Sequence, residues 1–168
     1  MQSEIDLSEP RQAVYQSFED GPGPCPRCGG RLRQSKQTYS VATRRGRKLL
    51  DSFIMGSDFG WYCDACPVVV INSRQVSEML GHSMPHWDVG NEFCVEGIVD
   101  LDAIPDHKRH LPIGGAENPI PLIEFQSPGV APRRKPLNKK ERQRRKKLLA
   151  RQLKGDRQDK RQTAEEGA

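Results

Sequence analysis

Two C-x-x-C motifs constrain this chain more than any other feature. They lie at residues 25–28, within CPRCGG, and at residues 63–66, within CDACP. Each motif offers two sulfur ligands from one tight turn, and Zn²⁺ prefers four such ligands in a tetrahedron. Gly29 and Gly30 suit the positive φ and the close backbone approach that such a turn needs. We therefore expect one structural zinc ion, with no open coordination position for catalysis, bound by Cys25, Cys28, Cys63 and Cys66.

The composition agrees with a small core that needs a metal to stabilise it. Hydrophobic residues make up 35% of the 168 residues and aromatic residues 6%, and a core this thin usually needs an additional staple. The N-terminus has no signal-peptide pattern and no run is long enough to span a membrane, so we expect a cytoplasmic protein with reduced thiols. A redox C-x-x-C pair, which would need a βαβ context, and unrelated buried thiols are the alternatives.

Local patterns predict the elements around the cysteines. Ser8-Glu9-Pro10, followed by Val14 and Phe18 four residues apart, predicts a short helix within residues 1–20. Alternating residues between 31 and 71 predict strands, with a basic turn at residues 44–47 that lets a hairpin fill the 34-residue gap between the motifs. The pair Asn72 and Gln75 resembles a capping box and predicts a helix that ends near Gly81.

The expected fold class is small mixed α+β, with a C4 zinc-ribbon β-hairpin core, short helices and a basic C-terminal tail that is disordered or helical. The expected organisation is an N-terminal segment at 1–20, a zinc-ribbon domain at 21–81, an irregular β-containing extension at 82–126, and a proline-rich linker with the basic tail at 127–168.

Other candidate groups are weaker. Cys94, between Phe93 and Val95, is most simply a buried apolar side chain. A second metal site made by His82, His86 and Cys94 is the alternative, although Pro85 disrupts the helical spacing of the two histidines. Asp100 and Asp102 alternate and are expected to share a solvent-facing strand surface. No constellation of nucleophile and base is present, so we expect a protein that is not an enzyme.

The cysteine region resembles YgiT-type zinc fingers, the zinc-binding half of MqsA-like antitoxins. The matching features are CPRC, RGRK between the motifs, WYCDAC, and a polar-capped helix near Asn72, over residues 25–80. The resemblance implies a structural zinc ion on the same four cysteines, often in a toxin-binding domain. Pro67 departs from the family pattern, and no helix-turn-helix follows.

The C-terminal segment is strongly basic. Residues 131–168 contain fifteen Lys and Arg against five Asp and Glu, whereas the first 130 residues carry a net charge of −5. Asn138 and Glu141 form the pattern of a capping box at the start of a helix, and Gly155 can end that helix. Such a charge favours a polyanionic partner and binding to phosphates. The candidate nucleic-acid-binding residues are Arg133, Arg134, Lys135, Lys139, Lys140, Arg142, Arg144, Arg145, Lys146, Lys147, Arg151 and Lys154.

The sequence therefore predicts a zinc-ribbon protein whose tail contacts nucleic acid, RNA rather than DNA, as a component or accessory of a ribosome or another nucleoprotein complex. The alternative is a protein-interaction module, in which an antitoxin-like zinc domain binds a partner protein. A solvated tail that only keeps the chain soluble remains the simplest competing interpretation of the basic segment.

Overall fold

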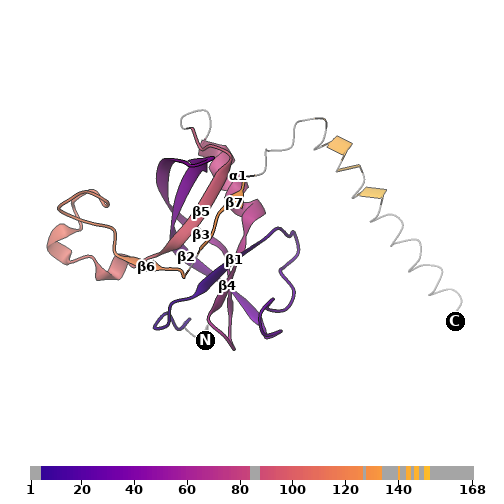
Figure 1. The fold of residues 1–168 in the computed structure, drawn as a ribbon, viewed down its shortest axis with the longest axis horizontal. Helices are drawn as coiled ribbons and strands as arrows, with labels where there is room; N and C mark the ends of the chain where they lie inside the picture. Colours follow the sequence, from indigo (N-terminus) through magenta and orange to yellow (C-terminus); the bar gives the residue numbers. More distant parts are fainter. Residues whose placement is uncertain are drawn as a thin grey trace, which may run out of the picture. The chain divides into compact units, whose positions relative to one another are not determined.

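The computed structural model describes residues 5–83, 88–126 and 128–133, together with positions 140, 143, 144, 146, 147, 150 and 151. The chain forms two units, Met1–Arg134 and Lys135–Ala168. The first unit, called the body below, contains every strand described here (Figure 1). Within the described part of the chain, no helix is long and apolar enough to span a membrane.

The body is built mainly of β-strands. One sheet has the order β1-β4-β3-β2-β5-β6, and β7 also pairs with β5. The predicted fold class, a mixed α+β zinc ribbon with short helices, is therefore wrong: the described body has one α-helix, α1 (Ser73–Ser83), and two 3₁₀ turns, η1 (Leu101–Ala103) and η2 (Asp106–Lys108). The strands are β1 (Gln12–Gln16), β2 (Leu32–Arg45), β3 (Lys48–Cys63), β4 (Val68–Asn72), β5 (Glu92–Val99), β6 (Leu122–Glu124) and β7 (Ala131–Pro132).

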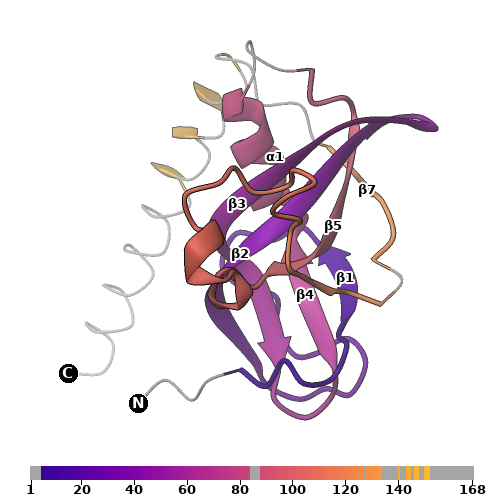
Figure 2. The same cartoon turned by 90° about the vertical axis from the view of Figure 1, so that its left-hand side faces the viewer.

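The predicted hairpin with its basic turn is confirmed and forms the centre of the sheet. Strands β2 and β3 pair from Arg45 opposite Lys48 down to Leu32 opposite Cys63. Gly46 takes a φ of +60° at the turn, where glycine adopts a left-handed conformation without steric cost. Register shifts interrupt the β2–β3 pairing at two places, and such bulges bend a strand and increase its twist. The hairpin is consequently curved rather than flat (Figure 2).

The N-terminal segment is a strand and not the predicted helix. β1 pairs in parallel with β4, with Val14 opposite Val70. Its side chains alternate between two apolar environments, because Ala13 packs in the main core and Val14 packs beside the cysteines. The four-residue spacing of Val14 and Phe18 reflects their packing in one cluster and not a helical face.

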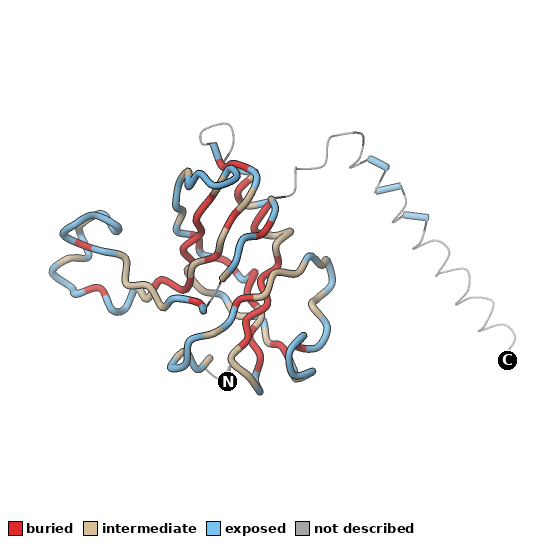
Figure 3. The backbone as a smooth tube through the Cα atoms, viewed as in Figure 1, coloured by how far each residue is buried: buried red, intermediate tan, exposed pale blue. Residues whose placement is uncertain are grey.

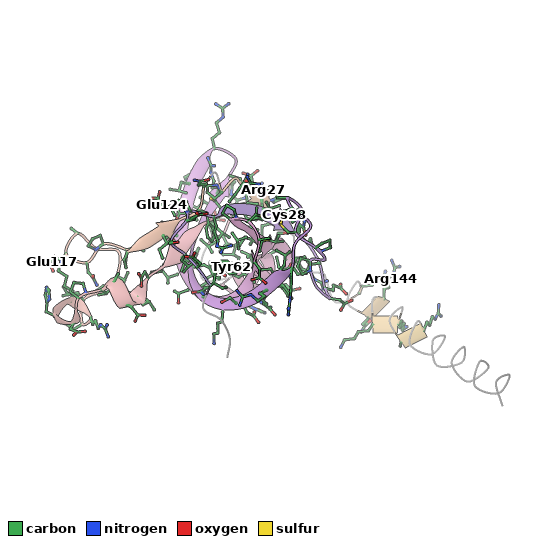
Figure 4. The ribbon with its side chains drawn as sticks, turned by 90° about the horizontal axis from the view of Figure 1, so that it is seen from below. Arg27, Cys28, Tyr62, Glu117, Glu124 and Arg144 are labelled. Atoms are coloured by element: carbon green, nitrogen blue, oxygen red, sulfur yellow. The ribbon has the colours of Figure 1, made fainter. Side chains whose placement is uncertain are left out.

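The sheet curls on itself into an incomplete barrel. An isolated bridge joins Gln12, at the start of β1, to Gln126, just after β6. The first and last strands of the sheet order are therefore brought together at this point. Figure 4 shows Tyr62, which is almost completely buried, inside the curl of the strands.

The inside of the curl holds the main core, and each of β2, β3, β4 and β5 contributes buried residues (Figure 3). Helix α1 contributes Val76 and Leu80 to this core, as the helical spacing predicts. The helix continues past Gly81 to Ser83. The predicted capping box does not form: Asn72 donates to the Phe18 carbonyl and Gln75 donates to Asp58.

Residues 100–121, called the arm below, extend between β5 and β6 (Figure 1). Asp100 and Asp102 do not share a strand face, which corrects that expectation. The Asp100 carboxylate instead accepts hydrogen bonds from the amides of Asp102 and Ala103 and caps η1. Asn118 is buried within the arm and donates to the carbonyls of Lys108 and Leu111.

Candidate metal centre

Four cysteines meet at the base of the β2–β3 hairpin. Cys25 and Cys28 lie in the loop that leads into β2, Cys63 is the last residue of β3, and Cys66 lies in the turn before β4. The pairing of Leu32 with Cys63 brings the two motifs together although 34 residues separate them. The hairpin therefore performs the closure that the sequence predicts.

The sulfur atoms have the spacing of a four-ligand site. All four lie within 4.8 Å of one another. The Sγ atoms of Cys25 and Cys66 are 3.6 Å apart, and those of Cys28 and Cys63 are 3.5 Å apart. Ligands bound at about 2.3 Å in a regular tetrahedron would have their sulfurs about 3.8 Å apart. The arrangement could therefore hold one metal ion with little movement of the side chains.

Backbone amides support two of the sulfurs. The amide of Gly30 donates to Cys28 Sγ at 3.3 Å, and the amide of Ala65 donates to Cys63 Sγ at 3.4 Å. Gly29 takes a φ of +72° in the first turn. A Cβ atom at position 30 would lie 3.1 Å from Cys28 Sγ and 3.2 Å from the Ala65 Cβ. Gly29 thus adopts the positive φ, and Gly30 allows the close backbone approach, that the sequence predicts.

The electrostatics of the cluster favour a bound cation. Burial, together with the neighbouring cysteine sulfurs, raises the pKa of Cys66 to about 12, and burial also raises the pKa of Cys63. Burial would raise the pKa of Cys25 too, but the backbone amides of Cys28 and Arg27 lower it to about 7. Several thiolates so close together repel one another, and a cation among them removes that repulsion.

A small apolar cluster surrounds the site and connects it to the sheet. Cys25 and Cys63 are buried with Leu32, Val68 and Val70. The rings of Phe18 and Trp61 meet edge to face at 6.1 Å beside this cluster. This second core is separate from the main core inside the curl. The four-cysteine cluster therefore lies against the end of the sheet at which β1, β3 and β4 meet.

Arg27, Arg31 and Arg33 follow the first cysteine motif closely in the sequence, where their charge could offset that of the thiolates. Arg33 forms an ion pair with Asp64 at 2.6 Å, and Arg27 and Arg31 are exposed; Figure 4 shows Arg27 beside Cys28. No sequence pattern indicates a role for Arg11, whose guanidinium donates to the Cys63 carbonyl at 3.1 Å and lies over the Tyr62 ring. Only the pairing of β1 with β4 brings it there, and no local pattern indicates that pairing.

The remaining thiol lies outside this cluster. Cys94 is partly buried on β5, and burial raises the pKa of its thiol. Its predicted partner His86 lies outside the described residues, and His82 is exposed. Among the described residues, the four-cysteine cluster is the one group with the geometry of a metal site.

The predicted nucleic-acid-binding residues are described in part. Arg133 belongs to the body, where its Nε donates to the Gly90 carbonyl at 2.7 Å. Lys140, Arg144, Lys146, Lys147 and Arg151 have exposed side chains and helical backbone, and Figure 4 labels Arg144. The residues that lie outside the described part are Arg134, Lys135, Lys139, Arg142, Arg145 and Lys154.

The fold and the site define a mainly β protein in which four cysteines at the base of a hairpin lie close enough together to hold one metal ion. Comparisons of the chain with protein-family models, with curated proteins and with solved structures find no match. The resemblance to YgiT-type zinc fingers therefore stays a prediction from the cysteine motifs.

Proposed function

We propose that this chain is a zinc-binding adaptor that contacts nucleic acid, RNA in preference to DNA, through its basic C-terminal segment. The observation that carries the proposal is the density of positive charge: nine Lys and Arg and one acid between residues 139 and 154. The five described bases of this stretch are exposed on helical backbone, where phosphates can reach them. Release of counterions from the nucleic acid then favours binding.

Zinc is the proposed metal because its preferences match the donor set. Thiolate is among its strongest protein ligands, and four thiolates in a tetrahedron are typical of its structural sites. Four protein ligands leave no coordination position for water or substrate. The proposed role of the ion is therefore to join the two cysteine turns and stabilise the second core, and we propose no catalytic step.

The setting that suits such a chain is a nucleoprotein complex such as a ribosome. Residues 1–130 carry a net charge of −5 and residues 131–168 a net charge of +10, so the C-terminal segment would contact phosphates and the body would contact protein. Aromatic side chains are absent from residues 131–168, so base stacking on this segment is excluded. Binding should follow the phosphate backbone and depend weakly on base sequence.

Binding to a labelled 20-nucleotide RNA, measured by fluorescence anisotropy at several salt concentrations, tests the proposal. If about five phosphates are neutralised, log K should fall with log salt with a slope near −3.5, about 0.7 per phosphate. A variant in which Gln replaces Lys140, Arg144, Lys146, Lys147 and Arg151 should lose most of the affinity for RNA. The same measurement with DNA of the same sequence tests the preference for RNA.

Circular dichroism of a peptide covering residues 131–168 adds an independent test. Like charges four residues apart destabilise a helix, so the peptide should be weakly helical alone and gain helix on RNA. Binding that ignores salt, or equal affinity in the Gln variant, would contradict the proposal. A protein partner retained by the chain after nuclease treatment would instead support the protein-interaction hypothesis.

A further inference from the structure

The tip of the β2–β3 hairpin, residues 44–50, is a second basic surface and lies on the body. Residues 43–50 read TRRGRKLL, with four bases and no acid. Arg45, Arg47 and Lys48 are exposed. Leu49 is exposed by 62%, the highest value among the large hydrophobic residues described as exposed. An exposed leucine among cations does not contribute to the core and suits contact with a partner.

The hairpin tip is an ordered projection of the sheet. Arg45 and Lys48 still pair as strand residues, and Gly46 and Arg47 alone make the turn. Figure 2 shows this end of β2 and β3 extending beyond the rest of the body. The backbone that carries its cations is therefore already ordered, and binding has to order only their side chains.

The charge at this end of the sheet is only partly balanced. Asp88 pairs with Arg45, and Glu92 stands opposite Arg44 on β5. No carboxylate of the described residues forms an ion pair with Arg47 or Lys48. The hairpin tip thus has positive charge available for an external anion.

Arg133, the last described residue of the body, lies beside the base of this tip. The amide of Asn91 donates to the Arg44 carbonyl, and the amide of Arg133 donates to the Asn91 carbonyl. Arg133 also donates to the Gly90 carbonyl through its side chain. Residues 90 and 91 therefore connect the hairpin to the last described residue of the body, from which the basic segment continues.

We propose that the hairpin tip is a second nucleic-acid contact and that it binds double-stranded RNA across the shallow minor groove. This inference rests on the proposed function and names the form of nucleic acid that the body recognises. The tip has no aromatic residue for stacking on unpaired bases. Arg47 and Lys48 reach the phosphates on either side of the groove, and Leu49 packs on the riboses and base edges that an RNA minor groove displays.

The test uses the full chain with a 20-base-pair RNA duplex and with a 20-nucleotide single strand. Arg47→Glu/Lys48→Glu should reduce duplex affinity by about tenfold and lower the magnitude of the salt slope by about 1.8, about 0.9 for each lost phosphate contact. Single-strand affinity, which the C-terminal segment supplies, should change by less than about twofold. The neutral variant Arg47→Gln/Lys48→Gln should show the same selectivity with a smaller loss. Thermal melts check that each variant is folded.

The matched control is Lys108→Glu/Arg109→Glu in the arm, which makes the same change in net charge. Equal duplex affinity in the tip and control variants would overturn the inference, as would equal losses for duplex and single strand. Leu49→Ser should weaken duplex binding without altering the salt slope, and an unchanged affinity would overturn the role of that side chain. Failure of the unaltered chain to bind either RNA would instead refute the proposed function itself.

Discussion

The hydroxyl oxygen of Tyr15 accepts a hydrogen bond from the backbone amide of Val95 at 2.9 Å. The same hydroxyl donates to the Gly129 carbonyl at 3.4 Å, and the Tyr15 ring meets Phe93 edge to face at 5.7 Å. On β5, strand β7 pairs at residues 92 and 93 and strand β6 pairs at residues 97–99. Val95 lies between these two pairings, and Tyr15 accepts the hydrogen bond of its amide. The contact links β1 to β5 across 80 residues of sequence.

Tyr15→Phe should therefore destabilise the body without altering its fold. The change keeps the ring and removes the hydroxyl, which leaves the Val95 amide without its acceptor. The expected cost is about 1–3 kcal/mol in the free energy of unfolding. Urea unfolding followed by tryptophan fluorescence measures it. A variant as stable as the original chain would show that water replaces the hydroxyl at no cost.

The paired hydroxyls of Tyr39 and Tyr62, 2.8 Å apart and buried, provide a second test. Either single change to Phe leaves one buried hydroxyl without this partner and should cost about 1–3 kcal/mol. The double change removes both, so its cost should be less than the sum of the two single costs. A double-mutant cycle measures this coupling. Additive costs would mean that each hydroxyl has another equally good partner.

The free energy of unfolding should decrease at alkaline pH because three tyrosines are buried wholly or in part. Burial raises the pKa values of Tyr15, Tyr39 and Tyr62 above the ordinary value of about 10. The unfolded chain then releases these protons at a lower pH than the folded chain does. The stabilisation is complete below about pH 10 and is lost as the pH rises above it. Urea unfolding from pH 8.5 to 11 should show this decrease, and Tyr15→Phe should make it less steep.

If the four-cysteine cluster binds zinc, replacing Cys63 should remove the metal and replacing Cys94 should not. The purified chain should contain about one Zn²⁺, and Cys63→Ser should lose it, because three thiolates rarely keep a structural site closed. The loss should loosen the second core around Leu32 and Val68 more than the main core, since the two clusters are separate. Elemental analysis measures the metal, and hydrogen exchange compares the two cores.

Cys94→Ala is the matched control for this experiment. It removes a partly buried thiol outside the cluster, so metal content should be unchanged and the free energy of unfolding should fall by about 1 kcal/mol. Loss of metal in this variant would mean that the ligand set is misassigned. A folded, metal-free preparation of the unaltered chain would refute the zinc proposal.

The sequence predicts the ligand set and the hairpin because both are local signals. Each C-x-x-C motif predicts a tight turn that presents two sulfurs. The alternating residues on either side of the basic turn predict a hairpin that brings the two motifs together. The pairing of Leu32 with Cys63 follows from these two facts together. Val76 and Leu80 likewise carry the period of a helix whose apolar face enters the core.

The errors concern contacts between distant segments. The β1 sequence carries two apolar residues four apart, which suggests a helix, but its parallel pairing with β4 stabilises it as a strand. Asp100 reads as part of an alternating strand, yet its carboxylate caps a 3₁₀ turn where the chain leaves β5. The fold class was wrong for the same reason, because β1, β5 and β6 join the hairpin sheet from outside the cysteine region.

The bridge between Gln12 and Gln126 has a consequence for how copies of this protein behave together. Open sheets present unpaired amides and carbonyls at their outermost strands, and these recruit strands from other molecules. Here the curl brings the outermost strands to each other, while β6 and β7 cover part of the free side of β5. Removing residues 122–133 would uncover that side of β5 and turn a self-contained sheet into a template for aggregation.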